Sequence, residues 1–281
     1  MDKKIKITVL SENTAQGAGL LAEHGLAYWI EFDGRRVLFD TGQGGVLAHN
    51  AFRLGVQLRE TDDIVLSHGH HDHTGGLPEA LCLARHAVVH AHPAALQQRY
   101  VKEQDGTIRE IGMPFPARRA LHEHPQRLVK TEGPSVILPH LTITGPIPRH
   151  HEFESYDGRF FLGGDCSHPD PLDDDQAVYV QTLQGTLVLL GCAHAGPINT
   201  LDYVCQLTGS NDIFAVIGGL HLYDAPPERI SQTIEHLKQF GIKRMAIGHC
   251  TGTAAMVAIW NAFPGQCSTL HVGARFEFPL P

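Results

Sequence analysis

The sequence predicts an α/β protein in which two halves, each built of strands and helices, pack face to face. Stretches with strand and helix periodicity alternate in the order β…βα…β…ββα…βα…β along 281 residues. Hydrophobic residues make up 42% of the chain, which is enough for a sizeable core. No internal repeat, low-complexity tract or linker divides the sequence. We therefore expect a single domain over residues 1–281.

The first third of the chain predicts mainly strands. They cover residues 4–10, 27–32 and 36–39, and Asp33-Gly34 between the last two is typical of a hairpin turn. Residues 46–54 carry apolar side chains at helical spacing and end at Gly55, as helices commonly do. A strand at 64–66, a helix at 77–84 and a strand at 87–91 complete this half.

Residues 93–155 differ from the sequence on either side. They are rich in proline, arginine and histidine, and prolines spread between positions 114 and 148 interrupt any long element. We predict that about 93–155 form an insertion that covers the functional site, with short strands at 136–138 and 141–143. The alternative is a surface excursion without a function.

The last third returns to alternating strands and helices. Strands at 177–180 and 186–190 flank a Gln-Gly turn and predict a second hairpin. A helix at 198–207 and a strand at 214–217 follow. Residues 228–240 place Ile230, Ile234 and Leu237 on one face of an amphipathic helix, which Gly241 ends before a strand at 243–247.

A run rich in histidine, HGHHDH at 68–73, stands where the predicted strand at 64–66 ends. Imidazole nitrogens and carboxylate oxygens are ligands that suit zinc and neighbouring metals. In an extended or turned segment His68 and His70 can point to one side, and Asp72 and His73 can approach from another direction. The alternative is a histidine-rich surface loop. The buried strand before the run and the Thr-Gly-Gly after it favour a metal site.

Three further histidines repeat the same pattern of apolar strand, small residue, histidine and turn. They are His194, His221 and His249. Each one alone could instead be a structural histidine. His150 and His151 lie in the predicted insertion and are candidates to face the site. The histidines in polar or helical surroundings are expected to be solvated: His24, His49, His86, His122, His124 and His236.

The HGHHDH run, preceded by FDTG at 39–42, resembles the H-x-H-x-D-H signature of the metallo-β-lactamase superfamily. The resemblance implies a four-layer αβ/βα sandwich with a metal site at the sheet edges. It implies a first metal position formed by His68, His70 and His194. It also implies a second position formed by Asp72, His73 and His249.

The sequence departs from the superfamily at the bridging aspartate. That aspartate usually ends an apolar strand as Gly-Asp, whereas here the strand ends in Gly191-Cys192. Either His194 replaces part of its function or Cys192 is itself a ligand. Asp165 follows Gly-Gly and looks like the missing motif, but no clear buried strand precedes it. We expect Asp165 to lie outside the site.

A narrower resemblance covers about residues 5–275. It rests on GCAHAG at 191–196, IGGLHL at 217–222, GHCTG at 248–252, TGPIPR at 144–149 with Phe-Glu at 153–154, and DDQA at 174–177. These motifs are similar to those of proteins labelled 7,8-dihydropterin-6-yl-methyl-4-(β-D-ribofuranosyl)aminobenzene 5′-phosphate synthase-like. The label implies a group transferase.

The ligand types predict hydrolytic chemistry. Zinc held by neutral imidazoles lowers the pKa of bound water from about 15.7 towards about 7. We therefore favour a hydrolase that uses zinc-bound hydroxide on a small anionic ester, phosphoester or lactone. Asp72 would bind metal and orient the nucleophile, and His221 would donate a proton to the leaving group or bind an anionic group. Arg149 is a candidate to bind a phosphate or carboxylate.

One or two zinc ions per chain are expected, with iron or manganese as alternatives. Besides the transferase implied by the subgroup, a metal-binding or redox module without hydrolytic chemistry is an alternative. Against that module, His70 stands where diiron members of the superfamily usually carry a glutamate. A second required substrate would indicate the transferase.

Charge and composition exclude several other classes. The net charge of −8 argues against nucleic acid or an anionic membrane as a nonspecific partner. No apolar run reaches the length of a transmembrane helix, and the charged start lacks the apolar segment of a signal peptide. Six scattered cysteines without a C-x-x-C pair suit reduced thiols. We expect a cytoplasmic protein with a small-molecule substrate.

Overall fold

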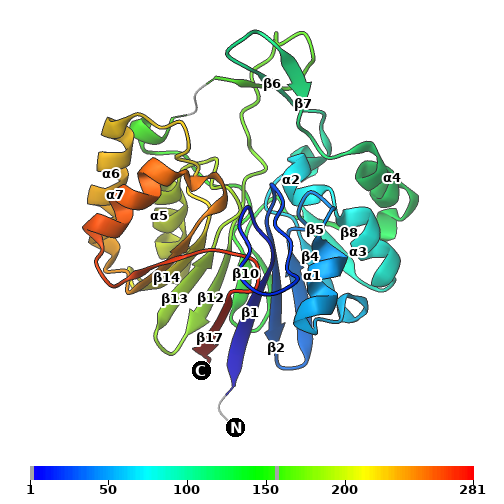
Figure 1. The fold of residues 1–281 in the computed structure, drawn as a ribbon, viewed down its shortest axis with the longest axis horizontal. Coiled ribbons are helices and arrows are strands. Elements are labelled where there is room, and N and C mark those ends of the chain that lie inside the picture. Colours follow the sequence, from blue (N-terminus) through cyan, green and yellow to red (C-terminus); the bar gives the residue numbers. More distant parts are fainter. Residues whose placement is uncertain (1–2, 156–157) are drawn as a thin grey trace.

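Two seven-stranded sheets form the centre of the computed structural model, which describes residues 3–155 and 158–281 (Figure 1). The first sheet has the order β17-β1-β2-β3-β4-β5-β8. Its strands β3, β4, β5 and β8 are parallel, and the others pair antiparallel. In chain order the strands are β1 (Lys4–Ser11), β2 (Ala27–Phe32), β3 (Arg35–Phe39), β4 (Asp63–Val65), β5 (Val88–Ala91), β8 (Leu128–Lys130) and β17 (Arg275–Pro279).

The second sheet has the order β16-β15-β14-β13-β12-β10-β9. Strands β13 to β16 are parallel, and the predicted hairpin of β12 and β13 is confirmed. The strands are β9 (Ser135–Leu138), β10 (Leu141–Ile143), β12 (Val178–Thr182), β13 (Gly185–Leu189), β14 (Ile213–Gly218), β15 (Arg244–Ile247) and β16 (Cys267–Thr269).

Helices cover the outer face of each sheet. The first sheet packs against α1 (Leu47–Leu54), α3 (Leu77–Leu83) and α4 (Phe115–Glu123). The second packs against α5 (Pro197–Thr208), α6 (Pro227–Leu237) and α7 (Thr253–Ala262). A four-residue helix, α2 (His71–Thr74), lies at the end of β4. Short 3-10 turns cover Leu58–Glu60, Pro93–Leu96, Pro125–Arg127, Glu152–Glu154, Lys238–Phe240 and His249–Thr251.

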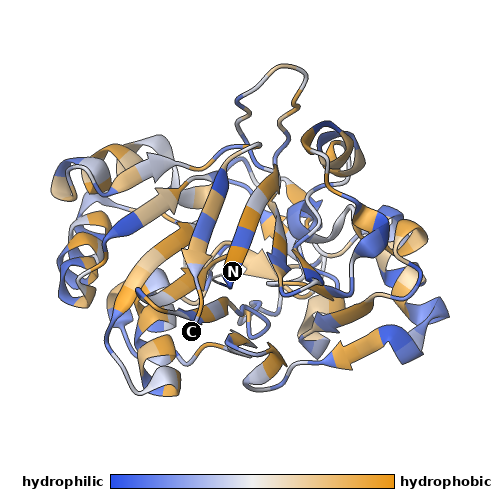
Figure 2. Cartoon of the chain, turned by 90° about the horizontal axis from the view of Figure 1, so that it is seen from below, coloured by the Kyte–Doolittle hydropathy of each residue, from blue (hydrophilic) through white to orange (hydrophobic). Residues whose placement is uncertain are grey.

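The resulting order of layers, helices–sheet–sheet–helices, confirms the predicted αβ/βα sandwich. Strand β1 shows why the layers form: Ile5 and Ile7 point into the core between the sheets, whereas Lys4 and Lys6 alternate with them and are exposed. Burying each isoleucine contributes about 1.5–3 kcal/mol. Seen from below, hydrophobic residues run along the strands between the helical layers (Figure 2).

The predicted insertion is only partly a cover. Strand β8 extends the first sheet, and β9 and β10, which match the two expected short strands, belong to the second. The cover is a three-stranded sheet of β6 (Tyr100–Lys102), β7 (Ile108–Glu110) and β11 (Phe160–Phe161). The prediction that prolines interrupt any long element was wrong at α4. Pro114 and Pro116 stand at the start of this helix, where a missing N–H costs nothing.

One buried carboxyl group, that of Glu154, contacts a helix of the second sheet and makes the protein's stability depend on pH. Glu154 is 1% exposed and accepts hydrogen bonds from the N–H groups of Ile198 and Asn199, in the first turn of α5, at 2.9 and 2.7 Å. Burial raises its pKa to about 7 despite these donors. The unfolded carboxyl, with its ordinary pKa of 4.5, releases its proton first as the pH rises.

We therefore expect the Glu154 contribution to stability to be complete below about pH 4.5 and lost as the pH rises towards about 7, a change of up to about 3 kcal/mol. Urea unfolding of the wild type and Glu154→Gln at pH 5 and pH 7.5 measures it. Stability of the wild type should fall more steeply with pH than that of the variant. Identical pH dependence in the two proteins would contradict the prediction.

Among the described residues, no helix is long and apolar enough to cross a membrane.

Candidate metal centre

Three imidazoles converge where β4 and β13 end, at the upper edge of the two sheets. Nε2 of His68 lies 3.0 Å from Nδ1 of His70 and 3.2 Å from Nε2 of His194. A single nitrogen cannot donate to both neighbours, because it carries at most one proton. Two nitrogens at about 2.0–2.1 Å from one zinc ion lie no more than about 4.2 Å apart. The two spacings around His68 therefore suit a shared metal ion, and the ligand atoms of His68 and His194 lie within 4.8 Å of one another and of the Cys192 sulfur.

The second predicted set converges beside the first. His73 and His249 approach with Nε2 atoms 3.1 Å apart. Oδ2 of Asp72 lies 3.4 Å from the His249 nitrogen and 3.6 Å from that of His73. Asp72 and His73 lie on α2, which the chain enters directly from the end of β4. His249 follows β15, so three distant segments, at 68–73, 194 and 249, supply the two positions.

The outer nitrogens of three ring systems are held by other side chains. Nδ1 of His68 contacts the Ser67 hydroxyl at 2.9 Å, and Nδ1 of His73 contacts Asp40 at 2.7 Å. Nδ1 of His249 contacts the Asn13 side chain at 3.0 Å. Such contacts orient metal-binding histidines and leave the inner nitrogen facing the ion.

The protonation states of these groups suit a cation. Burial holds the pKa of His68, His70 and His194 well below the usual range, so these rings are neutral and can offer lone pairs. Burial opposes a charge on His73 as well, but Asp72 and Asp40 outweigh it and raise its pKa to about 9. The two carboxylates thus favour a positive charge at His73, which a divalent ion can supply.

The backbone around the site is strained, as it commonly is at functional sites. Asp40, Ala193, His221 and His249 have positive φ angles of 59°, 56°, 46° and 50°. Gly69, between the candidate ligands His68 and His70, allows a close approach, because a Cβ there would collide with the carbonyl oxygen of Ala95.

A buried ionic network lies behind the histidine loop. Arg99 is fully buried, and its guanidinium contacts Asp174 at 2.7 Å and Asp170 at 3.0 Å. Asp174 also accepts a hydrogen bond of 2.7 Å from the N–H of Gly69. The network therefore ties the HGHHDH loop to the strand region of the cover, and no sequence motif pointed to Arg99.

Arg149 does not occupy the position predicted for a substrate-binding residue. Its guanidinium donates to the carbonyl oxygens of His194, Pro171 and Leu172 at 3.2, 3.0 and 3.3 Å. It is not among the residues that line the pocket. Its contacts satisfy backbone oxygens and hold the loop that carries His194.

A pocket of about 720 Å³ opens onto the centre. The cover contributes Arg109 and Phe160 to its wall, and the Phe160 ring lies 5.4 Å from His70 and 5.7 Å from His194. His221 also lines the pocket, with its ring 4.1 Å from that of His194. The pocket thus combines an apolar ring, basic side chains and the candidate metal ligands.

The structure also places the other residues that the sequence analysis singled out. His24 is exposed, as predicted, and it also lines the pocket with Nε2 3.7 Å from Asp72. No buried strand precedes it, so the pattern used for the other histidines missed it. Asp165 is exposed and accepts hydrogen bonds from Ser167, consistent with its expected place outside the site. His150 and His151 do not line the pocket; His151 contacts Asp202 at 2.7 Å.

Cys192 occupies the middle of the centre. Its sulfur lies 3.2 Å from Nε2 of His73. It groups with Asp72, His73 and His249 on one side and with His68 and His194 on the other, all ligand atoms of each group lying within 4.8 Å of one another. Cys192 therefore faces both candidate metal positions.

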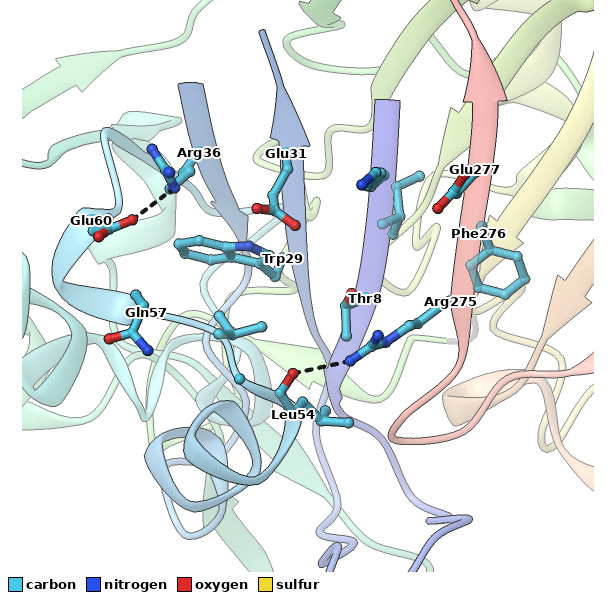
Figure 3. A pocket seen from close by; sticks show the side chains of 14 residues that line it. Thr8, Trp29, Glu31, Arg36, Leu54, Gln57, Glu60, Arg275, Phe276 and Glu277 are labelled. Carbon is cyan, nitrogen blue, oxygen red and sulfur yellow. Dashed lines mark hydrogen bonds and ion pairs between the residues drawn. The ribbon is translucent and has the colours of Figure 1, made fainter. Parts of the chain in front are cut away.

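A second hollow, of about 420 Å³, lies on the outer face of β3, β2, β1 and β17 (Figure 3). Trp29 forms part of its lining, and charged side chains surround the indole. Arg36 pairs with Glu60 at 3.1 Å, and Arg275 donates to the Leu54 carbonyl at 3.0 Å. This hollow contains none of the predicted site residues.

The fold and its histidine centre define a class of protein. The family model of the metallo-β-lactamase superfamily matches residues 21–249, and the chain belongs to this superfamily. It is similar to 7,8-dihydropterin-6-methyl-4-(β-D-ribofuranosyl)-aminobenzene-5′-phosphate synthase of Methanocaldococcus jannaschii, with 29% identity over 98% of this chain and 97% of the relative. The resemblance indicated by the sequence motifs is thereby confirmed.

Two solved structures resemble this protein in fold. A metal-dependent hydrolase of the β-lactamase superfamily superposes with a TM-score of 0.80 and 28% identity, covering 97% of this chain and 98% of that one. The short form of human tRNase Z has a TM-score of 0.55 and 13% identity, covering 98% of this chain and all of the other. The second likeness concerns the fold alone.

Proposed function

We propose that this protein is a metal-dependent hydrolase of a small anionic ester, phosphoester or lactone. The observation that carries the proposal is the convergence of His68, His70 and His194 beside Asp72, His73 and His249 at the floor of an open pocket. Zinc suits this set of nitrogen and oxygen ligands, and iron or manganese are alternatives. When bound, the metal supplies an activated water and positive charge.

The protein's own residues supply orientation and proton transfer. Burial by itself would raise the pKa of the Asp72 carboxyl. His73 and His249 outweigh this effect and hold the pKa well below the usual range, so Asp72 is ionised. We assign to Asp72 the orientation of the nucleophile. His221 faces the same pocket and is assigned proton donation to the leaving group.

The pocket wall is suited to an anionic group. Arg109 and Arg159 line it, each held by an acidic neighbour, Glu103 at 2.9 Å and Asp224 at 2.8 Å. These ion pairs hold two guanidinium groups at the wall of the pocket that the candidate ligands also line. We assign recognition of the substrate's negative charge to them in place of Arg149.

A second candidate is a group transferase. It is favoured by similarity along nearly the whole chain to a protein named as a synthase. Cys192 at the bridging position also distinguishes this centre from one with a bridging carboxylate. In a transferase the metal would bind the leaving group of one substrate while a second substrate attacks.

Metal content and the fate of solvent oxygen test the proposal together. Elemental analysis of the purified wild type should give about two metal ions per chain, and His194→Ala and His249→Ala should each lose about one. Panels of 4-nitrophenyl phosphate and carboxylate esters, and of lactones, are then assayed in ¹⁸O-labelled water. A hydrolase incorporates the label with one substrate present.

The outcomes separate the candidates. Bound metal with turnover that requires a second substrate and leaves the label in the solvent would favour the transferase. Absence of metal after loading with Zn²⁺, Fe²⁺ or Mn²⁺ would overturn both the hydrolase and the transferase proposals.

A further inference from the structure

Three neighbouring strands of the second sheet each end at a residue that can bind a soft metal. β13, β14 and β15 are adjacent and parallel, so their carboxyl ends meet at one edge. Cys192 follows β13, His221 follows β14 and Cys250 follows β15. The fold thus brings together two thiols and an imidazole that are 58 residues apart at their extremes.

The ligand atoms of these three residues are close enough for one ion. All three lie within 4.8 Å of one another. Ligand atoms of a tetrahedral zinc ion with nitrogen and sulfur ligands lie about 3.3–3.8 Å apart, so small side-chain rotations suffice. Cys192, Cys250 and His221 also line the pocket, which gives an ion a route of entry and leaves room for a fourth ligand.

Two observations point to a ligand at this place. Nδ1 of His221 is buried and has no hydrogen-bond partner among the described residues, although His221 adopts a strained positive φ of 46°. Gly219 lies against the Cys250 sulfur, since a Cβ at that position would stand 2.5 Å from it. The backbone is therefore shaped around the sulfur and the unpaired nitrogen.

We propose that Cys192, Cys250 and His221 form a further binding position for a thiophilic divalent ion such as Zn²⁺ or Co²⁺, beside the histidine centre. Two sulfurs and one nitrogen with an open fourth place are a ligand set that zinc accepts. Because Cys192 also faces the histidine positions, its sulfur can be shared between ions. When the position is filled, His221 is a ligand and no longer a proton donor. This binding position lies in the pocket to which the proposed function is assigned, and the inference depends on that function in no other way.

Titration of the metal-free protein with Co²⁺ tests the position without an activity assay. A thiolate bound to cobalt absorbs in the near ultraviolet, whereas cobalt held by nitrogen and oxygen absorbs in the visible alone. The wild type should develop the near-ultraviolet band. Cys250→Ser should reduce it by about half or more, because one of two sulfurs is removed. Cys205→Ser, at a buried thiol packed among the helices of the second sheet, is the matched control and should leave the band unchanged.

An equal band in Cys250→Ser and the wild type would overturn the inference, as would cobalt binding with visible absorption alone. In both cases the histidine centre, and with it the proposed function, would stand. Absence of any cobalt absorption would remove both.

A second measurement uses the wild type and so does not depend on a variant that folds. The protein is alkylated with iodoacetamide with and without Zn²⁺, and each cysteine is followed by mass spectrometry. Zn²⁺ should slow labelling of Cys192 and Cys250 and leave the exposed Cys82 unaffected. Equal labelling of Cys250 in both conditions would overturn the inference.

Discussion

Replacing His68 by alanine is expected to remove the metal ion of the first position and abolish activity, while the fold stays largely intact. Nε2 of His68 lies within 3.2 Å of both His70 and His194, so its loss leaves two separated nitrogens where three had converged. Two nitrogen ligands hold a divalent ion much less firmly than three. Elemental analysis and circular dichroism of the variant measure the two parts of this prediction.

His86→Ala is the matched control, because His86 is exposed and lies outside the pocket. It should keep the wild-type metal content. Wild-type metal stoichiometry in His68→Ala would show that the ligand assignment is wrong.

Replacing Arg99 by methionine is expected to destabilise the protein by about 3–5 kcal/mol, because removing one partner of a buried ion pair leaves an uncompensated charge. Arg99 and Asp174 are both fully buried, and Asp170 is 1% exposed, so two carboxylates would lose their partner together. The midpoint of urea unfolding measures the loss. Because Asp174 also holds the N–H of Gly69, metal binding by the HGHHDH loop should weaken as well.

An exposed ion pair provides the comparison. Arg119 contacts Glu123 one helical turn away on α4 at 2.7 Å, and both side chains are more than half exposed. Arg119→Met should change stability by no more than about 0.5 kcal/mol. If the two methionine variants unfold at the same urea concentration, the Arg99 network does not have the structural role given to it here.

Local patterns in the sequence predicted most of the elements correctly. The alternation in β1 and the turns at Asp33-Gly34 and Gly55 depend on neighbouring residues only, and the structure has a strand, a hairpin and a helix end at these places. Prolines were harder to interpret, because the same residue interrupts a helix in its middle and begins one at its first turn. Helix α7 carries no charged residue, so it lacks the amphipathic pattern from which a helix could have been predicted.

The candidate ligands were predictable to the extent that each one ends an apolar strand. This signal found His68, His70, Asp72, His73, His194 and His249, which the structure brings together. It could not find His24 or Phe160, because no such strand precedes the first and the second lies on the cover. Arg149 was proposed to bind substrate because a guanidinium suits a phosphate or carboxylate, a role that its contacts with three carbonyl oxygens do not support.

The sequence by itself determined the periodic elements, the superfamily signature and the types of metal ligand, because these depend on residues close together in the chain. Only the tertiary structure decided which distant groups meet. It pairs β17 with β1 at opposite ends of the chain and divides residues 93–155 among three sheets. It also places Cys192 between the histidine groups and next to Cys250. Such contacts depend on how strands order themselves within the sheets, which no local pattern records.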